Sequence, residues 1–271
     1  FPKGTIFVCT VAAPLIGKDG ADIKDAARID PKMIAFNTDG KILGEIKMGA
    51  GSAFAKASGA TATLPNANSF DKEGNLYVAD SGIGGAGFEP PLKTNGGVFM
   101  IPITSLDLLA EGKDAPIKFI AMTDSAPDGV EVAQDGSIHT NTVGAAAGMQ
   151  DPAQGGMYRL TQEDFTSGKL PAPMQSGLGA LDGLAFIGDL RFDTEIVKTQ
   201  GVLVTPAGGK PMLLTLDQDL KLSGPADIAI SQRPDGSYLL VIPELSANAP
   251  NTKQDAVTVV RLPPDFVKAP K

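Results

Sequence analysis

The chain contains very few of the residues from which most metal and catalytic centres are built. Among its 271 residues there is one cysteine, Cys9, and one histidine, His139. A single cysteine excludes an intrachain disulfide and any cysteine-based zinc or iron–sulfur site, and a single histidine excludes a three-histidine metal site. Because Cys9 lies in an apolar, strand-like run, we interpret it as a small buried hydrophobic residue.

Positive charge and long apolar runs are also scarce. The chain has 23 Lys and Arg against 31 Asp and Glu, which gives a formal net charge of −8. Such a balance lacks the basic surface that binds phosphate backbones, so nucleic acid is not an expected partner. No uncharged apolar run reaches the roughly 18 residues that a transmembrane helix needs. With 42% hydrophobic residues, the chain can nevertheless bury a core and is not expected to be disordered.

Turn-forming residues are abundant and lie between short apolar runs. The 32 glycines and 21 prolines are spread along the whole length, which predicts many turns joining many strands. Tight hairpins are expected at Asp39-Gly40, at residues 72–75, at Asp135-Gly136 and at Asp235-Gly236. Helical periodicity is limited to residues 103–111 and 21–28. We therefore expect an all-β protein built from consecutive hairpins.

One sequence pattern recurs along the chain: an Asn or Asp at the start of an apolar strand, followed in most copies by an Asp-Gly or Glu-Gly turn and a second apolar strand. The polar residues of its four full copies are Asn66, Asp128, Asp182 and Asp227. Consecutive ones are 45 to 62 residues apart, and a partial fifth copy occupies residues 2–8. Repeats of this length with short strands are typical of propeller blades. We predict a single β-propeller domain of four-stranded blades over residues 1–271. A β-sandwich of unrelated hairpins is the alternative, but it gives no reason for the recurring polar residue.

In a propeller, residues at the start of successive inner strands converge at one mouth of the central channel. Carboxylates brought together in this way need a cation to balance them. Oxygen ligands from Asp and Asn suit a hard cation, Ca²⁺ first and Mg²⁺ second. We therefore predict a metal site formed by Asn66, Asp128, Asp182 and Asp227. The alternative is that each residue only satisfies backbone amides of a local turn.

The segments Pro65-Asn66, Pro127-Asp128-Gly129 and Leu181-Asp182-Gly183, together with residues 76–82, resemble blade motifs of the SMP-30/gluconolactonase/LRE family, which is related to NHL propellers. The resemblance implies a six-bladed propeller that holds one divalent cation, often Ca²⁺, and hydrolyses lactones. It places Asp128 and Asp182 at metal positions, and Asn66 at an amide that faces the metal or the substrate. The chain departs from the family pattern in three respects. It shows five inner-strand segments, one of them partial, where six are expected, and it has Asp128 where Asn is usual. It also begins after the point where the family's first inner strand, which carries a Glu ligand, is expected to start.

The function expected from these features is metal-dependent hydrolysis of a lactone or a related small ester. Asp182 would act as general base, and Glu131, out of phase with its apolar neighbours, would face the channel and assist. His139 is a candidate for substrate binding, since some related lactonase propellers use a histidine as base. Glu131 as a solvated strand residue and His139 as a structural residue are the alternatives.

The alternative function is a non-catalytic propeller that binds a small ligand or a protein partner at its channel mouth. We expect a monomer. The chain starts with Phe1, not Met, which is consistent with a removed secretory leader and so with a secreted or periplasmic protein. A cytoplasmic protein is the alternative.

Overall fold

The computed structural model describes residues 1–10, 30–82, 96–123, 125–144, 155–216, 221–245 and 256–266. These residues form five antiparallel sheets that follow the chain order. The first sheet consists of β1 (Ile6–Thr10), β2 (Lys32–Phe36) and β3 (Ile42–Lys47). The second consists of β4 (Pro65–Phe70), β5 (Leu76–Asp80), β6 (Gly97–Ile101) and β7 (Lys118–Ala121).

The remaining sheets repeat this hairpin-to-hairpin order. The third consists of β8 (Pro127–Val132), β9 (Ile138–Thr142), β10 (Gly156–Leu160) and β11 (Gln175–Ser176). The fourth consists of β12 (Leu181–Ile187), β13 (Leu190–Glu195), β14 (Gly201–Thr205) and β15 (Met212–Leu213). The fifth consists of β16 (Ala229–Gln232), β17 (Tyr238–Glu244) and β18 (Ala256–Leu262).

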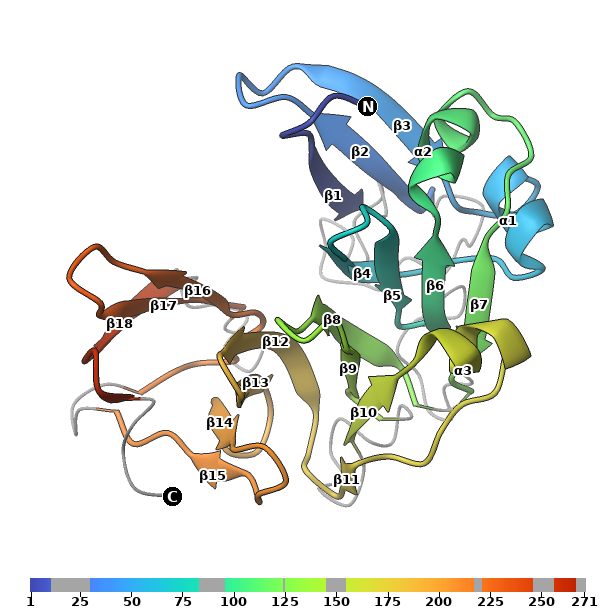
Figure 1. Cartoon of the computed structure of the whole chain (residues 1–271). Helices are drawn as coiled ribbons and strands as arrows, with labels where there is room; N and C mark the ends of the chain where they lie inside the picture. The colour runs from blue at the N-terminus through green and yellow to red at the C-terminus, as the bar shows by residue number, and fades with distance from the viewer. Residues whose placement is uncertain are drawn as a thin grey trace, which may run out of the picture.

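The five sheets are arranged around a central axis as the blades of a β-propeller (Figure 1). The first strand of each sheet lies nearest the axis, and the inner strands of consecutive sheets, β1 to β4, β4 to β8, β8 to β12 and β12 to β16, contact one another. The predicted all-β propeller is therefore confirmed. The five inner strands begin at, or just after, the five copies of the repeated pattern.

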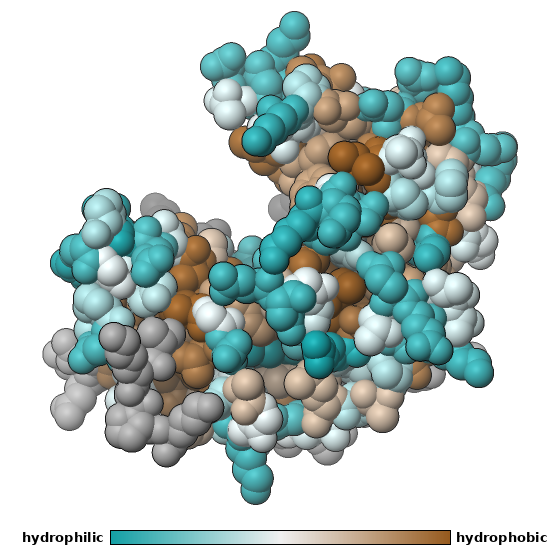
Figure 2. All heavy atoms as spheres, viewed as in Figure 1, coloured by the Kyte–Doolittle hydropathy of each residue, from teal (hydrophilic) through white to brown (hydrophobic). Residues whose placement is uncertain are grey.

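The expected number of six blades is wrong for the part of the chain that is described, where there are five sheets. Three sheets have four strands, whereas the first and the last have three each. The five sheets do not close into a ring: an opening separates the first sheet from the fifth (Figure 1), and the space-filling view shows it as a deep notch (Figure 2).

Three short helices lie outside the sheets: α1 (Ala53–Ser58), α2 (Ile103–Ala110) and α3 (Gln162–Ser167). The helix predicted at residues 103–111 is confirmed as α2, and the one predicted at 21–28 lies outside the described residues. The other two helices begin at side-chain caps, Ser52 for α1 and a Thr161–Asp164 capping box for α3. The four tight hairpins predicted from sequence are also present, each with a glycine at positive φ; the residues are Gly40, Gly74, Gly136 and Gly236.

The apolar core lies between consecutive sheets and is uneven. Clusters of 12, 11 and 10 buried residues fill the first–second, second–third and fourth–fifth interfaces. The interface between the third and fourth sheets has only two clusters of three buried residues each, Ala126 with Val143 and Ala180, and Met157 with Leu181 and Leu203. Different interactions must therefore join the sheets at this interface.

Candidate functional site

The four recurring polar residues occupy the same kind of position in four successive blades. At the start of β4, β8 and β12 the strand pairing shifts register, after Pro65, Pro127 and Leu181 respectively. In the fifth sheet, Pro225 forms an isolated bridge to Glu244 before β16 begins at Ala229. Such bulges re-aim side chains away from the regular pleat. The residues at these irregular positions are Asn66, Asp128, Asp182 and Asp227.

The glycine after two of these aspartates is required by the neighbouring strand. A Cβ on Gly129 would lie 2.5 Å from the carbonyl oxygen of Asp182, and a Cβ on Gly183 would lie 2.4 Å from the Cα of Asp227. Both distances are too short for any side chain. Only glycine therefore lets consecutive inner strands approach so closely, and this approach brings the aspartates of adjacent blades together.

These residues share one cavity of about 320 Å³ at the axis. Asn66, Asp128, Glu131, Asp182 and Asp227 all line it, so the structure brings together five of the six site residues predicted from sequence. Within the described part of the chain, no Lys, Arg or His side chain lines this cavity. Four carboxyl groups therefore face a common space without a basic partner.

Burial, and for some of them the charges of neighbouring carboxyl groups, raises the pKa values of these residues. Burial raises the pKa of Asp128 to about 7, and the charge of Asp227 adds to the shift, while a hydrogen bond from the Ser81 hydroxyl at 3.1 Å opposes it. The pKa of Asp182 is raised well above its usual range, first by burial and then by the charges of Asp128 and Asp227. Like charges close together cannot all ionise unless a cation balances them.

Glu131 and Asp227 complete the acidic set. Burial raises the pKa of Glu131 to about 7, against a hydrogen bond with Ser69 that lowers it. Burial also raises the pKa of Asp227, although its side chain remains accessible from the cavity. Glu131 lines both this cavity and a second one of about 500 Å³ further along the inner strands; its assisting role stays a prediction.

The donor set has the chemistry of a hard-cation site, since all its ligating atoms are carboxyl or amide oxygens. Among the described residues, however, no three acidic, histidine or cysteine side chains converge closely enough to form a metal site. The residues present therefore suit a divalent cation by type and charge. Side-chain rotation would be needed to gather them around one.

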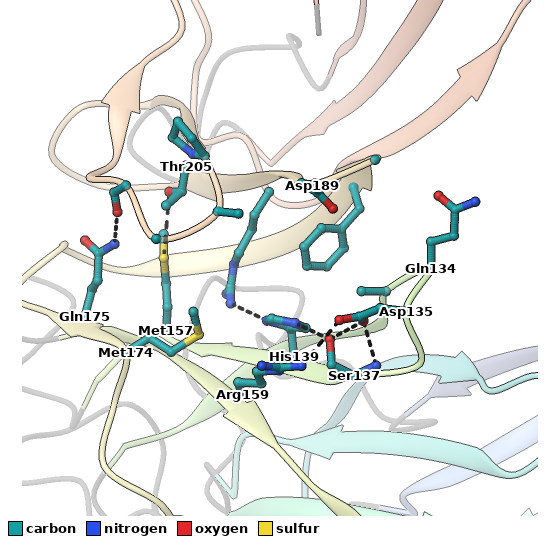
Figure 3. A pocket seen from close by; sticks show the side chains of 18 of the residues that line it. Gln134, Asp135, Ser137, His139, Met157, Arg159, Met174, Gln175, Asp189 and Thr205 are labelled. Carbon is teal, nitrogen blue, oxygen red and sulfur yellow. Dashed lines mark hydrogen bonds and ion pairs between the residues drawn. The ribbon is translucent and has the colours of Figure 1, made fainter. Parts of the chain in front are cut away.

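His139 is the predicted site residue that lies elsewhere. It is on β9, in register with Glu131 on β8 and therefore one strand further from the axis. Its buried ring lines a cavity of about 540 Å³ between the third and fourth sheets, shown in Figure 3. The structure thus separates His139 from the central carboxyl groups, because the second strand of a blade lies further from the axis than the inner strand that carries them.

Sequence reasoning missed a second set of acidic residues with a structural role. The carboxylates of Asp80, Glu195 and Glu244 end the second strands of their blades and accept hydrogen bonds from the backbone N–H of Leu64, Ala180 and Ser223, at 2.6, 3.2 and 2.5 Å. Each one thereby fixes the chain just before the polar residue of its own blade, Asn66, Asp182 or Asp227. The available signal was an acidic residue ending the second strand of three repeats.

Comparison with known proteins supports the fold alone. No family model matches the chain, and no curated protein does. Among solved structures, luciferin-regenerating enzyme, a known β-propeller, is similar with a TM-score of 0.51 and 12% identity over 86% of this chain and 71% of that one. A protein of unknown function from Bacteroides caccae gives a TM-score of 0.46 and 14% identity over 85% of this chain and 68% of that one. None of the helices in the described residues is long and apolar enough to cross a membrane.

Proposed function

We propose that the chain is a divalent-cation-dependent hydrolase of a lactone or a related small ester, with its active site in the central cavity. Asp128, Asp182, Asp227 and Asn66 would hold the cation, for which Ca²⁺ is the first choice and Mg²⁺ the second. The observation that carries the proposal is the set of four carboxyl groups lining one cavity that no basic side chain of the described residues lines.

The similarity to luciferin-regenerating enzyme is compatible with this proposal but does not carry it. A propeller supports many functions, so the residues at the axis carry the proposal. When bound, the cation would supply Lewis acidity toward the ester carbonyl and increase the acidity of a coordinated water.

The side chains of this chain then perform the proton transfers. Asp182 accepts a proton from the attacking water as the new C–O bond forms, and Glu131 assists from the adjacent inner strand. The bond between the carbonyl carbon and the ring oxygen breaks, and the protonated carboxyl returns its proton to the departing alkoxide. The product is a hydroxy acid. Asn66, whose side-chain nitrogen lies 3.4 Å from the Ser81 hydroxyl, would orient the substrate or the cation.

The test is hydrolysis of γ- and δ-lactones by the wild type, followed as acid release after chelation and after Ca²⁺ is restored. We expect activity only with the cation, and a loss of at least about a hundredfold in Asp182→Asn, which keeps the side-chain volume and removes the base. Asp235→Asn is the control, because Asp235 lies on an exposed hairpin turn of the fifth sheet.

Calorimetric titration with Ca²⁺ separates the two functions that the sequence left open. Binding that Asp182→Asn abolishes, without lactone turnover, would identify a non-catalytic propeller that uses the same site. Absence of both binding and turnover in the wild type would overturn the proposal.

A further inference from the structure

The interface between the third and fourth sheets is held by buried polar groups in place of a large apolar cluster. Arg191 of β13 forms a two-pronged ion pair with Asp193, at 2.8 Å from Nε and 2.7 Å from Nη2, and both residues are buried. Asn141 of β9 donates to the same Asp193 at 3.0 Å and accepts from the backbone of Gly129 at 2.8 Å. Buried networks of this kind are costly unless they are fully paired, and they are common at functional sites.

His139 extends this network toward a cavity. Its Nδ1 lies 3.4 Å from Nη1 of Arg191, and its Nε2 lies 2.8 Å from the Ser137 hydroxyl. Because a guanidinium can only donate, Nδ1 must accept, and the proton of the neutral ring is on Nε2. Nε2–H therefore donates to Ser137, whose hydroxyl donates to Asp135 at 2.5 Å. Because Nε2 of His139 already carries a proton, it cannot accept one from the Ser137 hydroxyl. His139 and Ser137 are therefore not arranged as the base and nucleophile of a catalytic pair.

The cavity beside His139 combines an apolar wall with cationic side chains. Its volume of about 540 Å³ falls within the range of small-molecule sites. Met157, Met174 and Phe186 supply apolar surface, and Figure 3 shows both methionines on the same side as His139. Arg159 and Lys210 line the cavity from the third and the fourth sheet, and both are exposed.

The charge around this cavity contrasts with that of the central one. Three cationic side chains, Arg159, Arg191 and Lys210, line it together with two acidic ones, Asp135 and Asp189. Asp135 is already engaged by the amide and hydroxyl of Ser137, at 2.9 and 2.5 Å, and by Arg159 at 3.3 Å. Arg191 is already paired with Asp193, so Arg159 and Lys210 are the exposed cationic side chains at this cavity, whereas no basic side chain of the described residues lines the central one.

The fifth sheet contains the same turn without the cavity residues. Asp235 accepts from the Ser237 hydroxyl at 2.6 Å and pairs with Arg261, which repeats the arrangement of Asp135, Ser137 and Arg159. Two residues after the serine, however, the fifth sheet has Leu239 where the third has His139. The Asp–Ser–Arg unit therefore occurs in the hairpins of both the third and the fifth sheet, whereas among these two only the third has His139 and its network.

We propose that the cavity between the third and fourth sheets binds a small organic anion with an apolar body, such as an aromatic or aliphatic carboxylate. The anionic group lies between Arg159 and Lys210, and the apolar body packs against Met157, Met174 and Phe186. This site is separate from the central cavity and does not depend on the function proposed for it.

The test uses the single histidine as a reporter. His139 gives the only imidazole ring signals in the ¹H NMR spectrum of this chain, and its ring lies in the wall of the cavity. Titration of the full chain with 2-naphthoate is expected to shift these signals along a saturable curve. 2-Naphthylmethanol has the same apolar body without the charge. Its affinity is expected to be lower than that of 2-naphthoate by a factor of about ten or more.

Charge-removing variants identify the anion contacts. Arg159→Gln and Lys210→Gln are each expected to weaken 2-naphthoate about tenfold. Arg261→Gln removes the equivalent arginine of the fifth sheet, and Lys47→Gln removes an exposed lysine of β3; both are expected to bind as the wild type does. All four positions are exposed, so the variants retain a folded chain for the measurement.

Three results would overturn the proposal. The first is the absence of any saturable shift of the His139 signals. The second is equal affinity for 2-naphthoate and 2-naphthylmethanol, which would indicate an apolar hole without anion recognition. The third is an effect of Arg159→Gln no larger than that of Arg261→Gln.

Discussion

At the scale of single residues, the same type of ionisable group acquires opposite properties from its neighbours. The carboxyl groups of Asp128 and Asp182 face other carboxyl groups and have raised pKa values. The exposed carboxyl of Asp135 accepts hydrogen bonds from Ser137, lies near Arg159 and has a lowered pKa. The position in the blade therefore decides which acid can serve as a ligand or base and which only caps a turn.

We predict that His139 stays neutral to unusually low pH. Burial lowers its pKa to about 4, and the charges of Arg191 and Arg159 add to this effect, while Asp135 opposes it. Because the pKa is lower in the folded chain than the unfolded value of 6.5, this histidine reduces stability as the pH falls from about 6.5 to 4. NMR titration of its ring protons measures the pKa directly.

Two arginine variants test the cause of the lowered pKa of His139. Loss of this cation should raise the pKa of His139, whereas Arg261→Gln in the fifth sheet should leave it unchanged. A wild-type pKa near 6.5 would contradict the buried position of the ring beside Arg191.

At the scale of elements, the bulges at the inner-strand starts and the glycines that follow two of them determine the site. The sequence alone predicted that Asn66, Asp128, Asp182 and Asp227 would lie together, because the polar residue recurs at one place in a repeated pattern; their role as ligands stays a prediction. It also predicted the hairpin turns and α2, whose signals are local. The burial of the polar side chains of β13, which reads Leu-Arg-Phe-Asp-Thr-Glu, was not predicted, because their partners lie both elsewhere in the same blade and on β9 of the neighbouring one.

The role of His139 was beyond sequence reasoning for the same reason. Its partner Arg191 comes from the next blade, 52 residues later, and no local pattern connects the two. The predicted carboxyl cluster needed only the repeat itself, whereas the polar interface required the packing of two sheets.

We predict that Gly183→Ala disrupts the packing of β12 on the fifth sheet. The new Cβ would lie 2.4 Å from the Cα of Asp227, a backbone atom that cannot rotate away. The expected loss is about 1–3 kcal/mol of unfolding free energy, measured by urea denaturation. Gly201→Ala on β14 is the matched control, because its Cβ would approach only the terminal Cδ1 of the exposed Leu213. Equal losses in the two variants would contradict the close approach of the inner strands.

At the scale of the whole molecule, five blades bring together an acidic centre, from which we expect the stability to depend on pH and, if the proposed cation site exists, on divalent cations. Asp128 and Glu131 have folded-state pKa values of about 7, well above their ordinary values of 3.8 and 4.5. A carboxyl with a raised folded pKa stabilises the chain at low pH and loses this contribution as the pH rises through the folded value.

Without a divalent cation, the chain is therefore expected to melt at a lower temperature near pH 7.5 than near pH 5. Asp80 contributes in the same direction from outside the cavity, because burial raises its pKa to about 7 as well. The decrease in melting temperature between pH 5 and pH 7.5 should be smaller in Asp182→Asn than in the wild type, and the same as in the wild type in Asp235→Asn. A melting temperature that rises over this range in the metal-free wild type would contradict the acidic centre.

The most direct test of the central claim is thermal melting near pH 7.5 with chelator and then with Ca²⁺, for the wild type and Asp182→Asn. A ligand of the folded state adds about 2.7 kcal/mol at a hundredfold excess over Kd, so we predict that Ca²⁺ raises the wild-type melting temperature by about 5 °C. In Asp182→Asn the chelated protein should be more stable than the chelated wild type, because a buried like charge is gone, and Ca²⁺ should add little. Identical curves with chelator and with Ca²⁺ in the wild type would contradict a cation site at the axis.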